Sequence, residues 1–443
     1  MKHLWLPSLI LISAMLPGER PGTEAQTISS HDSASASGPQ VTMTVFSDPH
    51  FYDPSLGTDG LAFEAYLNND RKLLRESREL MEMAVGVTLA SGTELVLIPG
   101  DLTKDGTMAS HLGMAGFLGQ LEKHGLSVYV VPGNHDVNNG EAMAYRADST
   151  VRMENVDPVC FEEIYGPYGY QEAISRDPHS LSYLAEPREN LWILGLDPCL
   201  YDQNEPDGHP HTGGEFDPGT MVWLEDQLTS VEARDKLIIA IMHHGILEHF
   251  RGQKRYFGEY VVEDHRKISK KLARLGVKVV FTGHYHANDI TMKKWGDGSF
   301  LFDIETGSLV TYPCPIRRVE ISADTMRIST EHLDSIPSMG RDFARFSRDY
   351  VHQGVSGIAE RTMIEMNLIP EDAHMLAKQI GDAFLSHYQG DEVPEDPLLD
   401  LEGVNLKGRV IISFRKKLVN GLYHDLPPSD NELVIHLPSG IFR

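Results

Sequence analysis

The sequence predicts a layered α/β fold in which helices cover a largely parallel sheet. Short apolar, β-branched runs recur along the chain, and each ends in a polar turn that contains Gly, Pro or Asp, which is typical of buried strands. Segments of helical character lie between several of these runs, and strands alternating with helices form such layers. The predicted strand regions are 41–50, 94–101, 126–136, 190–197, 236–245 and 277–286, and the predicted helices are 73–90, 108–124, 219–231 and 263–275.

The later part of the chain changes character. Two further strand regions, 299–309 and 317–333, are predicted to close the sandwich. From Pro337 the pattern becomes helical, with an apolar stripe of Leu376, Ile380 and Phe384 and with Gly390 as the C-cap. A Pro- and acid-rich stretch then precedes a last segment that is expected to include a strand or two. These features predict one domain over 41–335 and an accessory, mainly helical C-terminal domain over 336–443.

The first residues have the dimensions of a signal peptide. Lys2 and His3 precede a mostly apolar run that is too short to cross a bilayer comfortably, since a span takes about 20 residues. Small residues at Thr23 and Ala25 offer a cleavage point. We therefore expect residues 1–25 to be removed, 26–40 to form a Ser-rich linker, and the mature protein to be exported to the periplasm or outside the cell. A frayed N-terminal membrane anchor is the alternative, and no later stretch is apolar enough to span a membrane.

Charge and cysteine content narrow the classes of partner. The chain of 443 residues has 39 Lys and Arg against 64 Asp and Glu, a formal net charge of -25, so its average surface repels nucleic acid and anionic lipid headgroups. A general nucleic-acid partner is not expected. A small anionic substrate would need a local cationic anchor, which metal ions can supply. Of the three cysteines, Cys160 and Cys199 are the candidate pair for one disulfide, and Cys314 is left over.

Polar residues cluster where five of the predicted strands end. Each motif alone is also ordinary turn chemistry, and a lone histidine is more often structural than ligating. In extended chain, residues two apart point to the same side, so Asp48 and His50 are expected to face one space, and the rings of His284 and His286 are likewise expected to lie on one side. Together the strand ends supply oxygen and nitrogen ligands suited to two borderline or hard divalent metals. The candidate metal ligands are Asp48, His50, Asp101, Asn134, His243, His284 and His286.

The ordered motifs DPH, GDLTKDG, GNHD, MHHG and GHYH resemble the calcineurin-like metallophosphoesterase family over about 41–333. The segment FDPGTMVWLEDQL adds a similarity to the secreted, bacterial-type, purple-acid-phosphatase-like or phosphodiesterase-like branch. The resemblance implies a four-layer α-β-β-α metallophosphoesterase sandwich with a smaller, mainly helical C-terminal domain. It also implies that Asp101 bridges two metal ions. The first ion would be held by Asp48, His50, Asp101 and His286, and the second by Asp101, Asn134, His243 and His284.

The same resemblance implies roles for the neighbouring residues. His135 would not bind metal but would contact the substrate phosphate and protonate the departing oxygen as a catalytic residue. In His243-His244-Gly245, His243 is taken as the ligand and His244 as a spacer, and Asp105 is expected to support its loop. The family's purple members use a tyrosine ligand that GDLTKDG lacks, so a purple site is not expected and the metals are Mn, Fe or Zn.

The predicted function is that of an exported dinuclear-metal phosphohydrolase in which a metal-bound hydroxide attacks a small phosphodiester or phosphomonoester. A catalytically silent scaffold or binding protein on the same fold is the alternative. Several residues stay open at this stage. His209 and His211 either contact phosphate or lie on the surface, and Tyr165, Tyr168 and Tyr170 either pack a base or sugar or pack a loop. Asn288 and Asp289 are expected only to turn their loop, and the C-terminal domain either lids the site or mediates oligomerisation.

Overall fold

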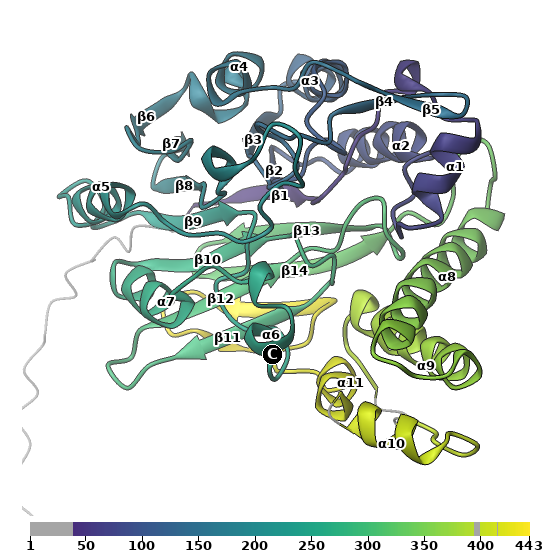
Figure 1. Ribbon diagram of the computed structural model, residues 1–443. Helices are drawn as coiled ribbons and strands as arrows, with labels where there is room; N and C mark the ends of the chain where they lie inside the picture. The colour runs from purple at the N-terminus through teal and green to yellow at the C-terminus, as the bar shows by residue number, and fades with distance from the viewer. Residues whose placement is uncertain (1–38, 394–398, 414) are drawn as a thin grey trace, which may run out of the picture. The chain divides into compact units, whose positions relative to one another are not determined.

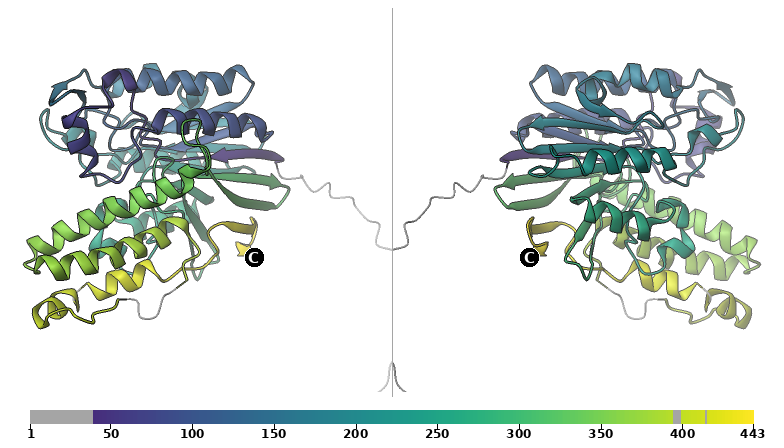
Figure 2. Two further views of the ribbon diagram at one scale, coloured as in Figure 1. Left: turned by 90° about the vertical axis from the view of Figure 1, so that its right-hand side faces the viewer. Right: turned by 90° about the vertical axis from the view of Figure 1, so that its left-hand side faces the viewer.

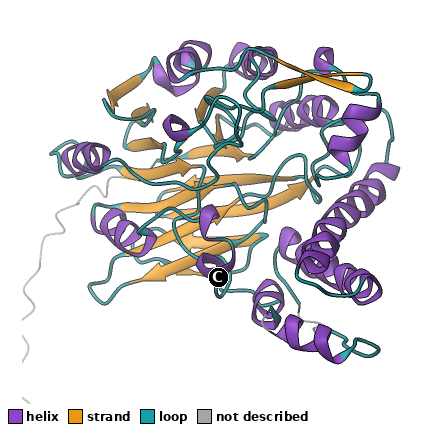
Figure 3. Cartoon of the chain, viewed as in Figure 1, coloured by secondary structure: helices purple, strands orange, loops and turns teal. Residues whose placement is uncertain are grey.

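The structure, a computed structural model, describes residues 39–393, 399–413 and 415–443. The predicted signal peptide and most of the predicted linker lie outside these residues. Within the described part of the chain, two seven-stranded sheets form the centre of the fold, and helices flank them (Figure 1). The predicted α/β sandwich is therefore confirmed, although both sheets are mixed rather than largely parallel. Figure 3 shows the helices grouped around the strands.

The first sheet has the order β16-β15-β14-β13-β1-β2-β3. Only β1, β2 and β3 run parallel, because the hairpin β13–β14 adds to the free edge of β1 in antiparallel register. The last strands of the chain return to this sheet, where β15 pairs with β14. Its strands are β1 Val41–Val45, β2 Leu95–Pro99, β3 Ser127–Val131, β13 Pro315–Ser322, β14 Thr325–His332, β15 Glu432–His436 and β16 Ile441–Phe442.

The second sheet has the order β11-β12-β10-β9-β8-β7-β6, with β8, β9, β10 and β12 parallel. Strand β9 is buried on both faces: Ile239 and Ile241 pack into the core shared with the first sheet, whereas Ile238 and Met242 pack into the core on the outer face. This double burial explains its uninterrupted apolar run. The strands are β6 Ala173–Arg176, β7 Tyr183–Arg188, β8 Leu191–Leu196, β9 Leu237–Met242, β10 Val277–Thr282, β11 Ile290–Lys294 and β12 Phe300–Glu305, and a separate hairpin joins β4 Met143–Arg146 to β5 Ser149–Arg152.

Helices form the two outer layers. Apolar residues of α2 and α3 join the core of the first sheet, and those of α5 and α7 join the outer core of the second. The helices are α1 Leu61–Leu67, α2 Ser77–Ala90, α3 Met108–Lys123, α4 Pro158–Ile164, α5 Pro218–Leu228, α6 Gln253–Tyr256, α7 His265–Arg274, α8 Asp342–Glu365, α9 Pro370–Gln389, α10 Leu406–Ser413 and α11 Lys416–Leu422, with single turns η1 Pro54–Leu56, η2 Gly166–Tyr170, η3 Tyr201–Gln203 and η4 Gly258–Tyr260. The four predicted helices are present, with ends shifted by a few residues. Helix α5, for example, begins at Pro218 because the Asp217 side chain caps its N-terminus.

The C-terminal helices share a core with the loops of the sandwich. Helices α8 and α9 pack together as a pair (Figure 2), and Leu376 of α9 is fully buried in a cluster that also contains Phe250 and Tyr285. Gly390 ends α9 with a φ of 73°, as expected for a glycine at this position. The domain limits at 335 and 336 stay a prediction. Among the helices of the described residues, none is long and apolar enough to cross a membrane.

The predicted disulfide is wrong, since all three cysteines are free. Cys160 lies on α4, whereas Cys199 follows β8, where its thiol donates to the carbonyl of Pro132 at 3.6 Å. Each thiol therefore has its own environment, and the size of the hydrophobic core leaves the fold independent of a covalent link.

Candidate metal centre

The seven predicted metal ligands lie together at one edge of the sandwich. The first sheet contributes the carboxyl ends of β1, β2 and β3, and the second sheet contributes those of β9 and β10. All seven side chains are buried, from 0% exposed at Asp48 and His243 to 4% at Asn134, His284 and His286. Because carboxyl ends of parallel strands meet at one edge, ligands far apart in the sequence converge there.

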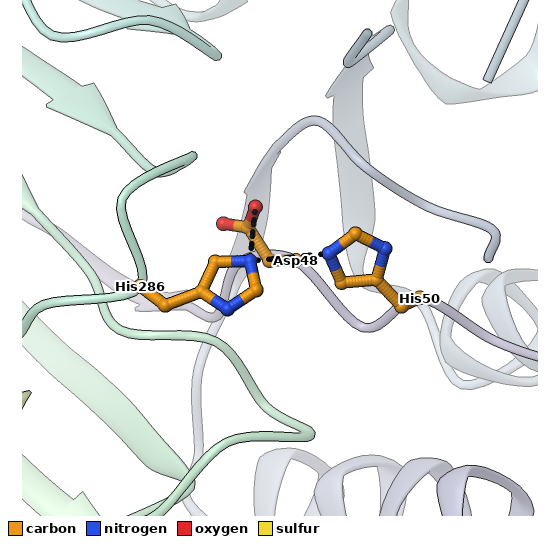
Figure 4. A group of neighbouring side chains, drawn as sticks. All are labelled: Asp48, His50 and His286. Carbon is orange, nitrogen blue, oxygen red and sulfur yellow. Dashed lines mark hydrogen bonds and ion pairs between the residues drawn. The ribbon is translucent and has the colours of Figure 1, made fainter. Parts of the chain in front are cut away.

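Asp48, His50 and His286 form the first group (Figure 4). Nε2 of His50 lies 3.1 Å from Nε2 of His286, and Nε2 of His286 lies 3.5 Å from Oδ1 of Asp48. The Asp48 carboxylate accepts hydrogen bonds from the Ser47 hydroxyl and from the His284 backbone N–H, which fix its orientation. Two ring nitrogens that face each other at this distance have lone pairs to share with a cation.

Asp101, His243 and His284 form the second group, and Asp101 joins it to the first. Oδ2 of Asp101 lies 3.3 Å from Nε2 of His243 and 3.5 Å from Nε2 of His50. Oδ1 of Asn134 lies 3.2 Å from Nε2 of His243. One carboxylate oxygen therefore stands between ring nitrogens of the two groups.

The backbone at these ligands differs from the extended conformation assumed from the sequence. Asp48, His50, Asp101, His284 and His286 all have φ between 37° and 78°, in the left-handed region that residues other than glycine rarely adopt. The expectation that the side chains meet is right, but the extended geometry behind it is wrong. Such strain persists only where the surroundings hold it, and it concentrates at functional sites.

The close approach of the loop after β3 to Asp101 explains why a glycine, Gly133, precedes Asn134. A Cβ atom at Gly133 would lie 2.1 Å from Oδ1 of Asp101, which is an impossible contact. The glycine therefore allows the loop after β3 to pass against the carboxylate. The same loop is held by Asp136, whose carboxylate accepts backbone N–H groups of Gly133, Leu102 and Thr103.

The donor set fits metal ions. Metal–ligand bonds of about 2.0–2.2 Å place two ligands of one ion roughly 3–3.5 Å apart, as these nitrogen and oxygen atoms are. The far ring nitrogens of His243, His284 and His286 are oriented by protein groups, as is usual for ligating histidines, whereas Nδ1 of His50 has no hydrogen-bond partner among the described residues. Nδ1 of His243 donates to the Pro99 carbonyl at 3.0 Å, and Nε2 of His284 donates to the Thr212 carbonyl at 2.9 Å, which leaves its Nδ1 as the atom with a lone pair.

Burial and neighbouring charges set the protonation of these groups. Burial, followed by nearby Lys72, holds the pKa of His50 well below its usual value, and burial with His243 does the same for His284. Burial also lowers the pKa of His286. For His243, burial is outweighed by the carboxylates of Asp101 and Asp48, which raise its pKa to about 9. The surrounding histidines hold the pKa of Asp101 well below its usual range in spite of burial.

His135 stands beside the two groups and faces the cavity. Its ring lies edge-on to His50 with centroids 5.0 Å apart, and its Nδ1 lies 3.0 Å from Oδ1 of Asp105. Asp105 is buried, and its carboxylate is paired with Lys104 as well. The Asp105 side chain thus does more than support its loop, because it fixes the His135 ring so that Nε2 is free.

The centre opens into a cavity of about 290 Å³ whose walls include residues that the sequence analysis missed. Arg71 and Lys72 come from the loop between α1 and α2, Tyr260 comes from η4, and its ring packs on His284 with centroids 4.5 Å apart. No local motif marks these three residues. The one property of the sequence that could have pointed to Arg71 and Lys72 is the need of an acidic chain for a cationic anchor beside an anionic substrate.

Other candidates lie outside the centre. The His209 side chain lines the cavity rim but is 90% exposed and lies 2.6 Å from Glu141, whereas His211 is an exposed residue. Tyr165, Tyr168 and Tyr170 pack in the hydrophobic core, so the loop-packing alternative is the right one. The His244 ring donates from Nε2 to Thr212, which agrees with a spacer. Asp289 accepts a 2.6 Å hydrogen bond from His249 and therefore does more than turn its loop.

Comparisons with known proteins give one matching family. A family model described as calcineurin-like phosphoesterase matches residues 41–288, which include all seven candidate ligands. A search of curated proteins gives no match. Among solved structures, a dimetal phosphatase from Danio rerio is 16% identical with a TM-score of 0.47, covering 66% of this chain and 96% of its own. A purple acid phosphatase from yellow lupin (Lupinus luteus) is 10% identical with a TM-score of 0.41, covering 67% and 52%. Since these scores are below 0.5, family membership rests on the sequence model.

Proposed function

Because the chain belongs to the calcineurin-like phosphoesterase family, we propose that it is an exported dinuclear-metal phosphohydrolase of small phosphodiesters or phosphomonoesters. The observation that carries the proposal is the position of Asp101, whose Oδ2 stands between ring nitrogens of His50 and His243. A carboxylate in that position suits a bridge between two ions. The motif pattern favours the secreted, purple-acid-phosphatase-like or phosphodiesterase-like branch of the family.

The proposed roles divide between two ions of Mn, Fe or Zn. Asp48, His50 and His286 would hold one ion and Asn134, His243 and His284 the other, with Asp101 shared. Bound in this way, the pair would polarise the phosphoryl oxygens and supply a water of lowered pKa for in-line attack.

The chain's own residues then complete the reaction. His135, oriented by Asp105, would donate a proton from its cavity-facing Nε2 to the departing oxygen, a role worth about 10²- to 10⁴-fold. Arg71 and Lys72 would attract and orient the anionic ester, which offsets the net charge of -25 of the chain. Burial of the ligands restricts water to the cavity side, so the electrostatic contributions of these groups are strengthened there.

Export remains part of the proposal. It is supported by the apolar run and small residues of 1–25, and it is tested by sequencing the N-terminus of protein recovered from the periplasm or medium of the expressing cell. A mature chain that begins near residue 26 is the expected result. A cell-associated chain with an intact leader would contradict it.

The test of the activity is reconstitution. Protein stripped by a chelator is supplied separately with Mn²⁺, Zn²⁺ or Fe²⁺ and assayed on bis-p-nitrophenyl phosphate and p-nitrophenyl phosphate, with Asp101→Asn as the control. We expect metal-dependent turnover in the wild type alone, and the preferred ester distinguishes a diesterase from a monoesterase. Stoichiometric metal binding with no turnover of either ester would contradict the proposal and favour the scaffold.

A further inference from the structure

We propose that the substrate is an amphiphilic phosphate ester, and that its hydrocarbon group occupies a second, apolar cavity beside the metal centre. This inference rests on the proposed function and names the substrate class for the same site. It is based on the C-terminal helices, which contribute none of the seven candidate ligands.

The apolar cavity measures about 390 Å³, within the range of small-molecule sites. Helices α8, α9, α10 and α11 build one side of it, and the segment of α6 and η4 with the loop after β10 builds the other. Figure 1 shows α11 between α6 and α9, and α11 contacts both. The walls are mostly apolar, with aliphatic and methionine side chains such as Ile358, Met363, Met366 and Ile380, and two arginines, one threonine and four tyrosines complete them. Methionine adapts its shape to flexible apolar ligands.

The two cavities share a wall. Arg71 and Tyr260 line both the apolar cavity and the cavity of the metal centre. The packing of α8 fixes this junction, because a Cβ at Gly354 would lie 2.7 Å from the carbonyl oxygen of Asp70 and 3.0 Å from Cα of Arg71. The helix thus presses directly on the loop that carries Arg71 and Lys72. An ester whose phosphate lies at the metals can extend its alcohol past Arg71 into the apolar cavity.

Polar groups stand where such a ligand would need them. Nε of Arg71 donates to the Tyr388 hydroxyl at 3.0 Å, which orients the guanidinium at the junction. The Tyr285 side chain is 3% exposed and lines the apolar cavity, and among the described residues its buried hydroxyl has no hydrogen-bond partner. Arg71 is therefore the polar group that a ligand meets at the junction of the two cavities.

The mostly apolar wall favours a hydrocarbon chain over a sugar. A sugar would leave several hydroxyls unpaired against these walls, which costs affinity, whereas each methylene removed from water gains it. The cationic junction and the apolar interior therefore match the two ends of one amphiphilic phosphate ester.

The test uses p-nitrophenyl phosphodiesters whose second alcohol is methyl, butyl or octyl, so that the leaving group stays constant. Each fully buried methylene is worth roughly three- to fourfold. Allowing for partial burial, we expect kcat/KM to rise about 100-fold from methyl to octyl. Octylphosphonate is titrated in parallel by calorimetry against methylphosphonate, with an expected difference in Kd of the same order.

Substitution of the wall sharpens the test. Ala359→Trp, on the cavity wall in α8, should lower kcat/KM for the octyl ester about 30-fold more than for the methyl ester. Ile364→Trp is the matched control, because Ile364 lies on the same helix, is 42% exposed and does not line the cavity. We expect the control to keep the wild-type dependence on chain length.

The outcomes separate this inference from the proposed function. Turnover that does not depend on chain length would overturn the apolar site and leave the phosphohydrolase intact. If no ester is turned over, calorimetry decides: tighter binding of octylphosphonate that Ala359→Trp removes would support the site, and equal binding of both phosphonates would overturn it. Should Ala359→Trp fail to fold, the wild-type series alone decides.

Discussion

Two buried clusters of histidines and carboxylates in this protein contain the same residue types but pair them differently. In the metal centre, ring nitrogens face one another as well as the carboxylates, as between His50 and His286 at 3.1 Å. In the second cluster, called here the paired network, each ring faces carboxylates: Nδ1 of His249 lies 2.6 Å from Asp289 and Nε2 lies 3.3 Å from Asp303. The paired network consists of His249, His387, Asp289, Asp303, Glu305 and Glu392.

The difference appears in the direction of the histidine pKa values. In the metal centre, burial and positive neighbours lower the pKa of His50 and His284, which favours neutral rings with a lone pair for a metal, whereas Asp101 and Asp48 raise the pKa of His243 to about 9. In the paired network burial is outweighed by carboxylates, mainly Asp303 for His249 and Glu392 for His387, and both pKa values are raised. A protonated imidazole must lose its proton before it can ligate, and both histidines of the paired network are held protonated by carboxylates, although Asp289, His387 and Glu392 lie close enough to hold an ion. The clusters therefore differ in their proportion of neutral rings, because in the metal centre only His243 has a raised pKa, whereas that of His50, His284 and His286 is lowered.

The largest expected effect separates the two clusters through one isosteric change. Asp101→Asn should lower turnover at least about 10³-fold and reduce bound metal, because the bridging charge is lost. Asp303→Asn, the matched change in the paired network, should keep its metal. Steady-state kinetics with elemental analysis measure both. Equal metal loss in the two variants would remove the distinction.

A second change concerns a histidine that belongs to neither cluster. His135→Ala should keep the wild-type metal content but lose about 10²- to 10⁴-fold in turnover, since it removes the proton donor held by Asp105. The exposed His211→Ala serves as the control and should change turnover less than about twofold. Full activity in His135→Ala with metal bound would contradict the assigned role.

In the paired network the same kind of change should act on stability. His249→Gln should lower the free energy of unfolding by about 3 kcal/mol, because Asp289 and Asp303 lose the charge that pairs them in a buried site. Urea unfolding of the metal-free protein measures this loss. His50→Gln is the counterpart, and we expect it to lose metal with little effect on metal-free stability. If His249→Gln lost metal and His50→Gln instead lowered the stability of the metal-free protein, the roles assigned to the two clusters would be wrong.

The smallest expected effect is a pH dependence of the metal-free protein. His249 faces Asp289, Asp303 and Glu305, and His387 faces Glu392, Asp289 and Glu305, so both histidines have raised pKa values. Burial also raises the pKa of Glu305 to about 8. Groups with a raised folded-state pKa stabilise fully below their unfolded pKa, about 6.5 for histidine, and lose that stabilisation as the pH rises through the folded value.

The free energy of unfolding should therefore fall as the pH rises from about 6.5, by an amount on the order of 2 kcal/mol, and His243, whose pKa is raised to about 9, adds to this fall in the metal-free protein. Denaturant titrations across this interval, with a chelator present throughout, measure it. Stability that rises with pH over the same interval would mean that the histidines of the paired network are neutral.

Much of the fold and the meeting of the seven candidate ligands could be predicted, because buried strands leave uninterrupted apolar runs and residues at strand ends are fixed by the turn that follows. The strands β15 and β16 could be expected only as a strand or two in the last segment, since the apolar run of β15 is short and β16 has two residues. The left-handed backbone at the ligands depends on contacts between loops, which no local pattern records.

Residues that reach the site through tertiary packing could not be predicted from the sequence either. Arg71, Lys72 and Tyr260 reach the cavity only because α8 and η4 place them there. Asp289 was assigned to a turn because its partner, His249, lies forty residues away. Contacts between residues this far apart in the sequence decide which carboxylates are available to a metal and which already form an ion pair with a histidine.

The most direct test of the central claim is the metal content of the protein purified without chelator, measured by elemental analysis. We predict about two ions per chain, held by the metal centre, with none in the paired network. A third ion that His249→Gln or Glu392→Gln removes would show that the paired network also binds metal. No bound metal after Mn, Fe and Zn have each been supplied would contradict the metal centre itself.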